Sequence, residues 1–226
     1  MKHADADGII GEVEEILSTP INDNLVPQRL HIRDDAAKLL IEIIAKTSGD
    51  YVEIGSFVGG SAILAAGAME MAGRPGIVFC VDPFTRGETE LDTLVLPQWV
   101  PSQHQTFWSN IIRAGHQHRV VAFKQYNPPF PEPIYFRWFS VGLIDGNHIF
   151  PGPQLDAHTL AKRITDYLLF DNAEYIDVET AIQEMLNTGE WEEYRSVEYK
   201  SGRGEEGKTN IFTVLRRIGG THEVVS

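Results

Sequence analysis

Two kinds of hydrophobic pattern alternate along most of the chain. Short runs of consecutive apolar residues are typical of strands buried on both faces, and stretches with an apolar residue every three or four positions are typical of helices. Five runs predict strands: 51–54, 77–81, 120–123, 139–144 and 167–170. Six stretches predict helices: 9–17, 36–44, 61–72, 106–114, 155–164 and 178–186. Strands that alternate with helices in this way predict a parallel sheet with right-handed crossovers.

The last part of the chain has a different pattern. Segments 191–199 and 210–215 are two strand-like runs, and a charged, glycine-rich segment at 201–207 joins them. We expect a hairpin that adds antiparallel pairing at one edge of the sheet. The predicted fold is therefore α/β: a doubly wound, mostly parallel seven-stranded sheet of the Rossmann-like kind, with a C-terminal antiparallel hairpin.

Boundaries within the chain follow from the same patterns. Residues 1–32 are expected to form a helical N-terminal extension, residues 33–217 the main domain, and residues 218–226 a C-terminal tail. Asp34 or Asp35 is expected to cap the second helix, because a carboxylate can accept hydrogen bonds from the free N–H groups of the first turn. The N-terminal helices are also the candidate surface for a homodimer.

Composition and charge limit the kinds of protein to consider. The chain has 226 residues, 42% of them hydrophobic, which suits one globular domain with a core of its own. Its 19 Lys and Arg against 32 Asp and Glu give a net charge of −13. That charge argues against nucleic acid or an anionic membrane as a partner, because phosphate groups are bound by clustered cations. Cys80 is the single cysteine, so an internal disulfide and a zinc–cysteine cluster are both excluded.

No targeting or membrane segment is evident in the sequence. The first residues lack a basic stretch followed by an apolar one, so no signal peptide is expected. The longest run of small and apolar residues, 62–69, is far below the ~20 residues that span a bilayer. We therefore expect a cytoplasmic protein.

A glycine-containing turn is expected between the first strand and its helix, in the segment VEIGSFVGGS at 52–61. Glycines at the carboxyl end of such a strand let the backbone approach a ligand closely. The spacing fits neither the dinucleotide motif G-x-G-x-x-G nor a phosphate-binding loop that ends in Gly-Lys-Ser/Thr. The alternative is a tight turn that only packs the helix on the strand.

Asp82 ends the second strand, 27 residues beyond Gly55. A carboxylate at this point of a βαβ unit can accept hydrogen bonds from both ribose hydroxyls of a nucleotide-like ligand. Taken alone, Asp82 would be an ordinary solvated loop residue. Its pairing with the glycine turn favours an adenosine-type ligand.

Oxygen-bearing side chains end the next two predicted parallel strands. Asp145 follows the fourth strand, and Asp171 and Asn172 follow the fifth. The 26 positions from Asp145 to Asp171 hold one crossover unit, so the two strands should be neighbours about 4.8 Å apart. Three hard oxygen ligands around one point suit Mg²⁺ or Mn²⁺, with positions left for water or substrate. Alternatively, each side chain only caps a helix or orders a loop.

His148 lies three residues after Asp145, in the sequence Asp145-Gly146-Asn147-His148. Imidazole exchanges a proton near neutral pH, so His148 is the candidate catalytic base for a substrate hydroxyl that the metal has made more acidic. The alternatives are a direct metal ligand and a histidine bonded to nearby backbone.

Together these motifs resemble the class I S-adenosylmethionine-dependent methyltransferases, and among them the metal-dependent O-methyltransferases related to catechol O-methyltransferase and the macrocin-type sugar O-methyltransferases. The resemblance covers about residues 33–217. It rests on four segments: Val52-Glu53-Ile54-Gly55-Ser56, Val81-Asp82-Pro83, Leu143-Ile144-Asp145-Gly146-Asn147-His148 and Leu168-Leu169-Phe170-Asp171-Asn172. The first is shared by many methyltransferases, and the last two together are more selective.

The resemblance implies a role for each matching residue. The cofactor-binding residues would be Glu53, Gly55, Ser56 and Gly59 at the methionine part of S-adenosylmethionine and Asp82 at its ribose, with Ser61 and Asp145 alongside. The divalent cation would be held by Asp145, Asp171 and Asn172. Catechol-type members carry a lysine base where this chain has His148, and sugar-type members more often read Ile-Asp-Gly-Asp-His, so Asn147 departs from them. The implied acceptor is a small-molecule hydroxyl, on a phenol or catechol or on a sugar.

Two other functions are compatible with the same residues. A nicotinamide-dependent oxidoreductase, which would use NAD or NADP on a similar sheet, is disfavoured by the missing G-x-G-x-x-G. In a non-catalytic module that only binds an adenosyl ligand, the acidic residues would serve folding alone.

Overall fold

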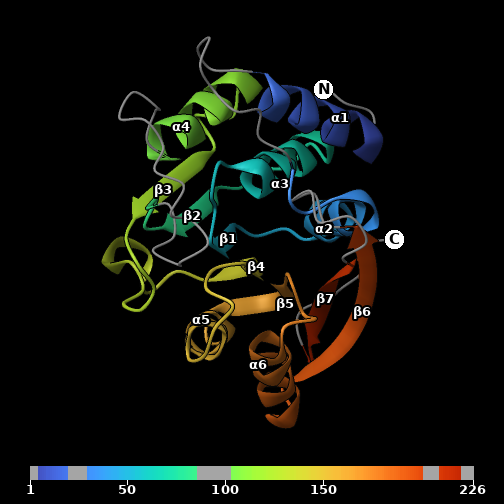
Figure 1. Ribbon diagram of the computed structural model, residues 1–226, viewed down its shortest axis with the longest axis vertical. Helices are drawn as coiled ribbons and strands as arrows, with labels where there is room; N and C mark the ends of the chain where they lie inside the picture. The colour runs from blue at the N-terminus through green and yellow to red at the C-terminus, as the bar shows by residue number, and fades with distance from the viewer. Residues whose placement is uncertain (1–4, 20–29, 86–102, 201–208, 220–226) are drawn as a thin grey trace.

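The computed structural model describes residues 5–19, 30–85, 103–200 and 209–219. A seven-stranded sheet with the order β3-β2-β1-β4-β5-β7-β6 runs through its middle (Figure 1). The strands are β1 Tyr51–Ile54, β2 Val78–Asp82, β3 Val120–Lys124, β4 Phe139–Ile144, β5 Ile164–Phe170, β6 Trp191–Lys200 and β7 Thr209–Arg217. The helices are α1 Ala6–Ser18, α2 Asp34–Lys46, α3 Gly60–Met71, α4 Gln103–Ala114, the 3₁₀ helix η2 Glu132–Ile134, α5 Gly152–Ala161 and α6 Ile176–Asn187.

The first five strands, β1 through β5, are parallel, as predicted. β1 lies between β2 and β4, and β3 and β5 continue the parallel sheet on either side. The last two strands are antiparallel: β7 pairs with β5, and β6 pairs with β7 at the edge. The predicted doubly wound sheet with a C-terminal hairpin is confirmed. The segment expected to join the hairpin strands, 201–207, and most of the expected tail at 218–226 lie outside the described residues.

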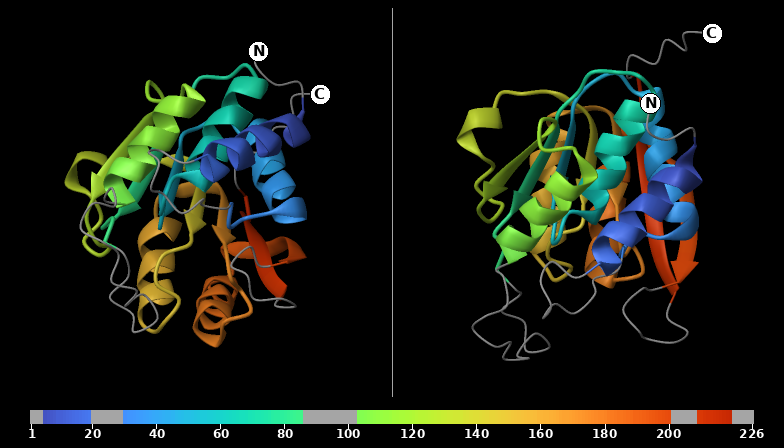
Figure 2. Two further views of the ribbon diagram at one scale, coloured as in Figure 1. Left: turned by 45° about the horizontal axis from the view of Figure 1, so that its top comes forward. Right: turned by 90° about the horizontal axis from the view of Figure 1, so that it is seen from above.

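Helices cover both faces of the sheet. α1, α2, α3 and α4 lie on one face, and α5 and α6 lie on the other (Figure 2). Alternate side chains of a strand point to opposite faces, so each central strand contributes to two cores. Tyr51 of β1 belongs to the core under α1–α4, whereas the next residue, Val52, belongs to the core under α5 and α6. No helix within the described ranges is long and apolar enough to cross a membrane.

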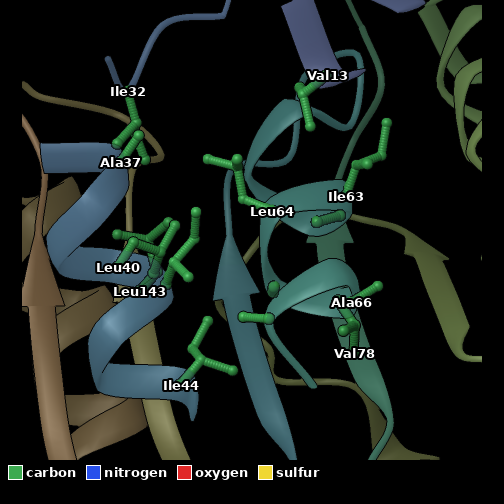
Figure 3. Packing of buried hydrophobic residues seen from close by; sticks show 14 of the residues in the cluster. Val13, Ile32, Ala37, Leu40, Ile44, Ile63, Leu64, Ala66, Val78 and Leu143 are labelled. Atoms are coloured by element: carbon green, nitrogen blue, oxygen red, sulfur yellow. The ribbon is translucent and has the colours of Figure 1, made fainter. Parts of the chain in front are cut away.

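The core under α1–α4 has two layers of helices. Leu40 of α2 and Leu64 of α3 are buried in one cluster with Leu143 of β4 (Figure 3). Helix α1 packs outside α3, and the γ2 carbon of Ile9 lies 2.9 Å from the point where a Cβ on Gly67 would be. Because Gly67 lacks that atom, the two helices approach closely.

The predicted cap of α2 is wrong. Its N-cap residue is Arg33, whose side chain makes no capping hydrogen bond. Asp34 and Asp35 instead lie within the first turn. There the two carboxylates still interact favourably with the positive end of the helix dipole.

The predicted end of the helix at 155–164 is also wrong. α5 ends at Ala161, and Ile164 is already the first residue of β5. Its δ1 carbon lies 2.7 Å from the point where a Cβ on Gly142 of β4 would be, so Ile164 fills the space that this glycine leaves. The helical spacing of apolar residues continues through the turn and hides the boundary.

Candidate functional site

The carboxyl ends of the central strands bring the predicted site residues together. Ile54 of β1 lies opposite Ile144 of β4, which in turn lies opposite Phe170 of β5. The hydrogen-bond ladder continues one residue further on each side. The Asp145 N–H donates to the Ile54 carbonyl oxygen at 2.9 Å, and the Asp171 N–H donates to that of Ile144 at 3.1 Å. The two aspartates predicted as metal ligands therefore end neighbouring strands at the same level.

Gly55 permits a close contact between the turn after β1 and the end of β4. Its φ is +89°, and a Cβ on it would lie 2.0 Å from the carbonyl oxygen of Asp145. No L side chain fits there unless the backbone moves. Gly59, with a φ of +92°, is the N-cap residue of α3. The fold itself therefore requires the glycine turn, whether or not a ligand approaches it.

The carboxylate of Asp82 clamps the same turn. Its Oδ2 accepts hydrogen bonds from the N–H groups of Ser56 and Phe57, both at 2.8 Å, and its Oδ1 accepts one from Phe84 at 2.5 Å. Burial raises the pKa of Asp82, although these three bonds favour the charged form. A carboxylate offers about four lone pairs, so one direction on Oδ1 is left for a ribose hydroxyl. The contact of Asp82 with a ribose stays a prediction. The carboxylate has an acceptor direction left for one ribose hydroxyl, whereas the sequence predicted contacts with both.

Glu53 is fully buried in the core under α1–α4. The hydroxyl of Tyr51 donates to its Oε2 at 2.9 Å. Burial raises the pKa of Glu53 to about 7, while the hydroxyls of Ser56 and Ser61 favour its ionised form. The carboxyl group therefore lies behind these two serines and has no exposed surface with which to touch a ligand.

A pocket lies between the glycine turn, the end of β4 and the segment that leads into α2. Its polar lining residues are His31, Ser56, Ser61 and Asp145, and Phe57 forms part of its wall. The rings of His31 and Phe57 stack with their centroids 5.0 Å apart. Three residues predicted to bind the cofactor thus share one surface. Sequence reasoning missed His31, because no motif marks the segment before α2.

Asp171 is buried beside Asp145. Burial, together with the nearby Asp145 carboxylate, raises the pKa of Asp171 well above its usual range. The Tyr199 hydroxyl donates to its Oδ1 at 2.6 Å. A bound cation would relieve the repulsion between the two carboxylates. Sequence reasoning missed Tyr199, which is 28 residues away and carries no signal of its own.

Asn172 follows with a left-handed backbone, at a φ of +57°, and is buried. Asparagine adopts this conformation more readily than most residues. Its Nδ2 donates to Oε1 of Glu174 at 3.3 Å. The amide oxygen of Asn172 therefore points away from Glu174.

His148 lies at the rim of this cluster. Its ring stacks on that of Tyr175, with centroids 5.4 Å apart and an angle of 16° between the planes. Its Nε2 lies 3.5 Å from Oδ1 of Asp145 and is buried without a hydrogen-bond partner in the part of the chain that the structure describes. An unpaired buried nitrogen next to a carboxylate suits a bound group between them, either a cation or a substrate hydroxyl.

The donor set fits a divalent cation if Asn172 contributes. Among the residues described, no three His, Cys, Asp or Glu side chains group closely enough to hold a metal ion. Asp145, Asp171 and the Asn172 oxygen are hard ligands of the kind that Mg²⁺ and Mn²⁺ take, with water completing the shell. The structure brings these three predicted ligands to neighbouring strand ends, and coordination itself stays a prediction.

A second buried carboxyl group supports the loop that carries His148. Asp156 of α5 accepts a hydrogen bond from Nδ2 of Asn127 at 2.6 Å. Its Oδ2 lies 3.0 Å from the point where a Cβ on Gly146 would be. Burial raises the pKa of Asp156 to about 7. Sequence reasoning missed this pair, because a lone acid in a helical stretch ordinarily faces solvent.

Three large apolar side chains that neighbour His148 or Tyr175 in the chain are exposed. Ile149, Phe150 and Ile176 are 60%, 67% and 71% exposed. The first two follow His148 in the chain, and Ile176 follows Tyr175, on which the His148 ring stacks. Apolar side chains next to a few polar groups are common in small-molecule sites.

Comparison with known proteins finds similarity in structure but not in sequence. The chain matches no protein-family model, and no curated protein matches it. An O-methyltransferase from Bacillus cereus in complex with SAH (S-adenosylhomocysteine) superposes with a TM-score of 0.61 at 16% identity, over 92% of this chain and 91% of that one. A putative caffeoyl-CoA O-methyltransferase from Staphylococcus aureus gives 0.60 at 12% identity, over 93% and 91%. A putative RNA methyltransferase from Pyrococcus horikoshii gives 0.58 at 11% identity, over 93% and 98%.

The chain has the methyltransferase fold. At 11–16% identity the similarity concerns the fold alone. The names of these neighbours include both O-methyltransferases and an RNA methyltransferase, so the fold does not select the acceptor. The acceptor has to be argued from the site.

Replacing Gly55 by Ala should destabilise the protein more than the same change at Gly115. Both glycines have a positive φ, +89° and +79°, so both Ala variants carry backbone strain of about 1–3 kcal/mol. Only Gly55 also meets a backbone atom, whereas a Cβ on Gly115 finds no described atom within 4 Å. Urea unfolding measures the two losses, and equal losses would contradict the required contact with Asp145.

Stability should fall as the pH rises through the range in which Glu53 ionises. Its pKa of about 7 in the folded chain exceeds the ordinary 4.5, so folding favours the protonated form. The contribution of protonated Glu53 to the free energy of unfolding is complete below pH 4.5 and is lost by pH 7, a difference of about 3 kcal/mol. Asp156, also raised to about 7, adds to the slope in the same window.

The Glu53→Gln variant should lose its share of this slope in urea unfolding from pH 5 to pH 8. Glu198→Gln, on an exposed position of β6, should keep the wild-type slope. A Glu53→Gln profile parallel to the wild type would contradict the assignment.

Proposed function

We propose that the protein transfers a methyl group from S-adenosylmethionine to the hydroxyl oxygen of a small molecule, with the help of a divalent cation. The observation that carries the proposal is the position of His148, whose Nε2 lies 3.5 Å from Oδ1 of Asp145. Asp145 lines the pocket of the glycine turn and ends the strand next to that of Asp171. The similarity to an O-methyltransferase in complex with SAH supports the choice of donor.

The donor would bind across the glycine turn. Ser56, Ser61 and Asp145 line the pocket there, and their hydroxyl and carboxylate groups suit the charged ends of a methionine moiety. Asp82 would offer its remaining lone pair to the ribose. Glu53 would act through the two serines, since it is buried behind them.

Asp145, Asp171 and Asn172 would hold the cation. When bound, a divalent cation supplies positive charge that makes a nearby acceptor hydroxyl more acidic. Burial and the neighbouring Asp145 carboxylate raise the pKa of Asp171, and a cation bound there would offset this by favouring the charged form. His148 would accept the hydroxyl proton at its unpaired Nε2, held in place by the stack on Tyr175. Methyl transfer then yields a methyl ether and S-adenosylhomocysteine.

The apolar side chains near His148 favour a phenol or catechol over a sugar. Ile149, Phe150 and Ile176 offer surfaces that a flat aromatic acceptor would cover, whereas a sugar would leave them exposed. The net charge of −13 disfavours RNA, which the name of the Pyrococcus horikoshii neighbour specifies.

Replacing Asp171 by Ala should abolish Mn²⁺ binding and leave S-adenosylhomocysteine binding intact. Calorimetry measures both, and methylation of catechol should slow at least about 100-fold, because metal charge stabilisation is worth several kcal/mol. Glu198→Ala is the control. Wild-type Mn²⁺ affinity in the Asp171→Ala variant would contradict the ligand assignment.

Wild-type protein that binds NADH instead of S-adenosylhomocysteine would favour the oxidoreductase, and uptake of S-adenosylhomocysteine without Mn²⁺ would favour the non-catalytic module.

Replacing His148 by Gln should slow methylation by about 100- to 10,000-fold and leave Mn²⁺ affinity unchanged, because the change removes a proton acceptor but no ligand. His118→Gln, at an exposed position in the turn before β3, serves as the control. A marked loss of Mn²⁺ affinity would instead identify His148 as a ligand.

A further inference from the structure

The C-terminal hairpin reaches one of the side chains proposed to bind the cation. Tyr199 of β6 and Asn210 of β7 are partners in the hairpin register. The Tyr199 hydroxyl donates to Oδ1 of Asp171 at 2.6 Å, and Nδ2 of Asn210 donates to that hydroxyl at 3.2 Å. The hydroxyl oxygen thus accepts from Asn210, and its own proton is committed to Asp171.

A second contact from the hairpin reaches Asn172. The Ile211 N–H donates to Oε2 of Glu174 at 2.8 Å, and Nδ2 of Asn172 donates to Oε1 of the same carboxylate at 3.3 Å. The Ala173 N–H also donates to the Ile211 carbonyl oxygen at 2.8 Å, which holds this loop against β7. A carboxylate has only acceptors to offer, so Asn172 presents its NH₂ group to Glu174 and its Oδ1 to the opposite side.

We propose that Tyr199 and Glu174 are positioning residues for the divalent cation. Tyr199 engages Oδ1 of Asp171 and leaves Oδ2 to bind the ion. Glu174 sets the amide of Asn172 so that its oxygen is the atom available to the ion. The inference rests on the proposed function, because it requires the cation site.

The hydrogen bond between Tyr199 and Asp171 is buried, so its loss is expected to affect cation binding. Tyr199 is 4% exposed and Asp171 is 2% exposed, so water does not readily replace a lost bond between them. Hydrogen-bond partners of metal ligands typically contribute about 10- to 100-fold in metal affinity. An Asp171 carboxylate without this donor would be less well oriented towards the ion.

The first test replaces Tyr199 by Phe, which removes the hydroxyl and keeps the ring. Mn²⁺ is titrated into protein saturated with S-adenosylhomocysteine, and free Mn²⁺ is followed by electron paramagnetic resonance. We expect the Kd for Mn²⁺ to rise at least about 10-fold. The Kd for S-adenosylhomocysteine without metal should stay within about twofold of the wild type, whereas a merely structural role would move both constants together.

Tyr194→Phe is the matched control for the first test. Tyr194 lies on the same strand, and its hydroxyl accepts a hydrogen bond from Lys46 at 2.9 Å, whereas that of Tyr199 donates to Asp171. The Kd for Mn²⁺ should not change in this variant.

The second test replaces Glu174 by Gln, which keeps the size of the side chain but leaves it one acceptor. When that oxygen accepts from Ile211, the new NH₂ group faces Asn172. Two NH₂ groups cannot hydrogen-bond to each other, so the Asn172 amide has to rotate. Its NH₂ group then faces the ion, and an amide NH₂ group is not a metal ligand. We expect a rise of at least about 10-fold in the Kd for Mn²⁺, with Glu198→Gln as the unchanged control.

The outcomes separate the two proposals. Wild-type Mn²⁺ affinity in both variants would overturn the positioning role and leave the proposed function standing. Wild-type affinity in one variant would overturn the role of that residue alone. Wild-type protein that binds S-adenosylhomocysteine but no Mn²⁺ would overturn cation assistance and the positioning role together.

Discussion

The contact between Gly55 and the carbonyl group of Asp145 is the constraint on which the candidate site depends. Because β1 pairs with β4 in parallel, the residues that follow the two strands, Gly55 and Asp145, lie in close contact at the edge of the sheet. Only a residue without a Cβ tolerates that distance, and Gly59, four residues later and also with a positive φ, begins α3 as its N-cap. Asp82 then ties the turn to β2, and Asp171 aligns with Asp145 through β5.

Much of this edge could be predicted from the sequence, because parallel strands that alternate with helices leave few arrangements. Asp145 and Asp171 are separated by one crossover, and strands so connected are usually neighbours. Their alignment at the carboxyl edge follows from the direction of the strands alone. The hairpin could be predicted on similar grounds, since two strand-like runs with a short connection pair with each other.

The partners of these residues could not be predicted in the same way. A carboxylate at a strand end looks the same in sequence whether it faces a ligand or the protein backbone. Asp82 accepts a hydrogen bond from Phe57, whose φ of +46° is a backbone conformation that the sequence does not indicate. The bond from Tyr199 to Asp171 depends on where the hairpin lies against β5, which periodicity does not specify. Periodicity also failed at Ile164, where a helical spacing crosses into a strand.

The place of β7 in the sheet has a consequence for the order in which the molecule is assembled. β7 follows β6 in the chain, yet in the sheet it lies between β5 and β6. A chain emerging from the ribosome therefore exposes the edge of β5 until β7 has been made. The glycine turn and its pocket belong to the part that is translated first. Asp171 and Asn172 receive their outer hydrogen bonds only after the two hairpin strands have been made.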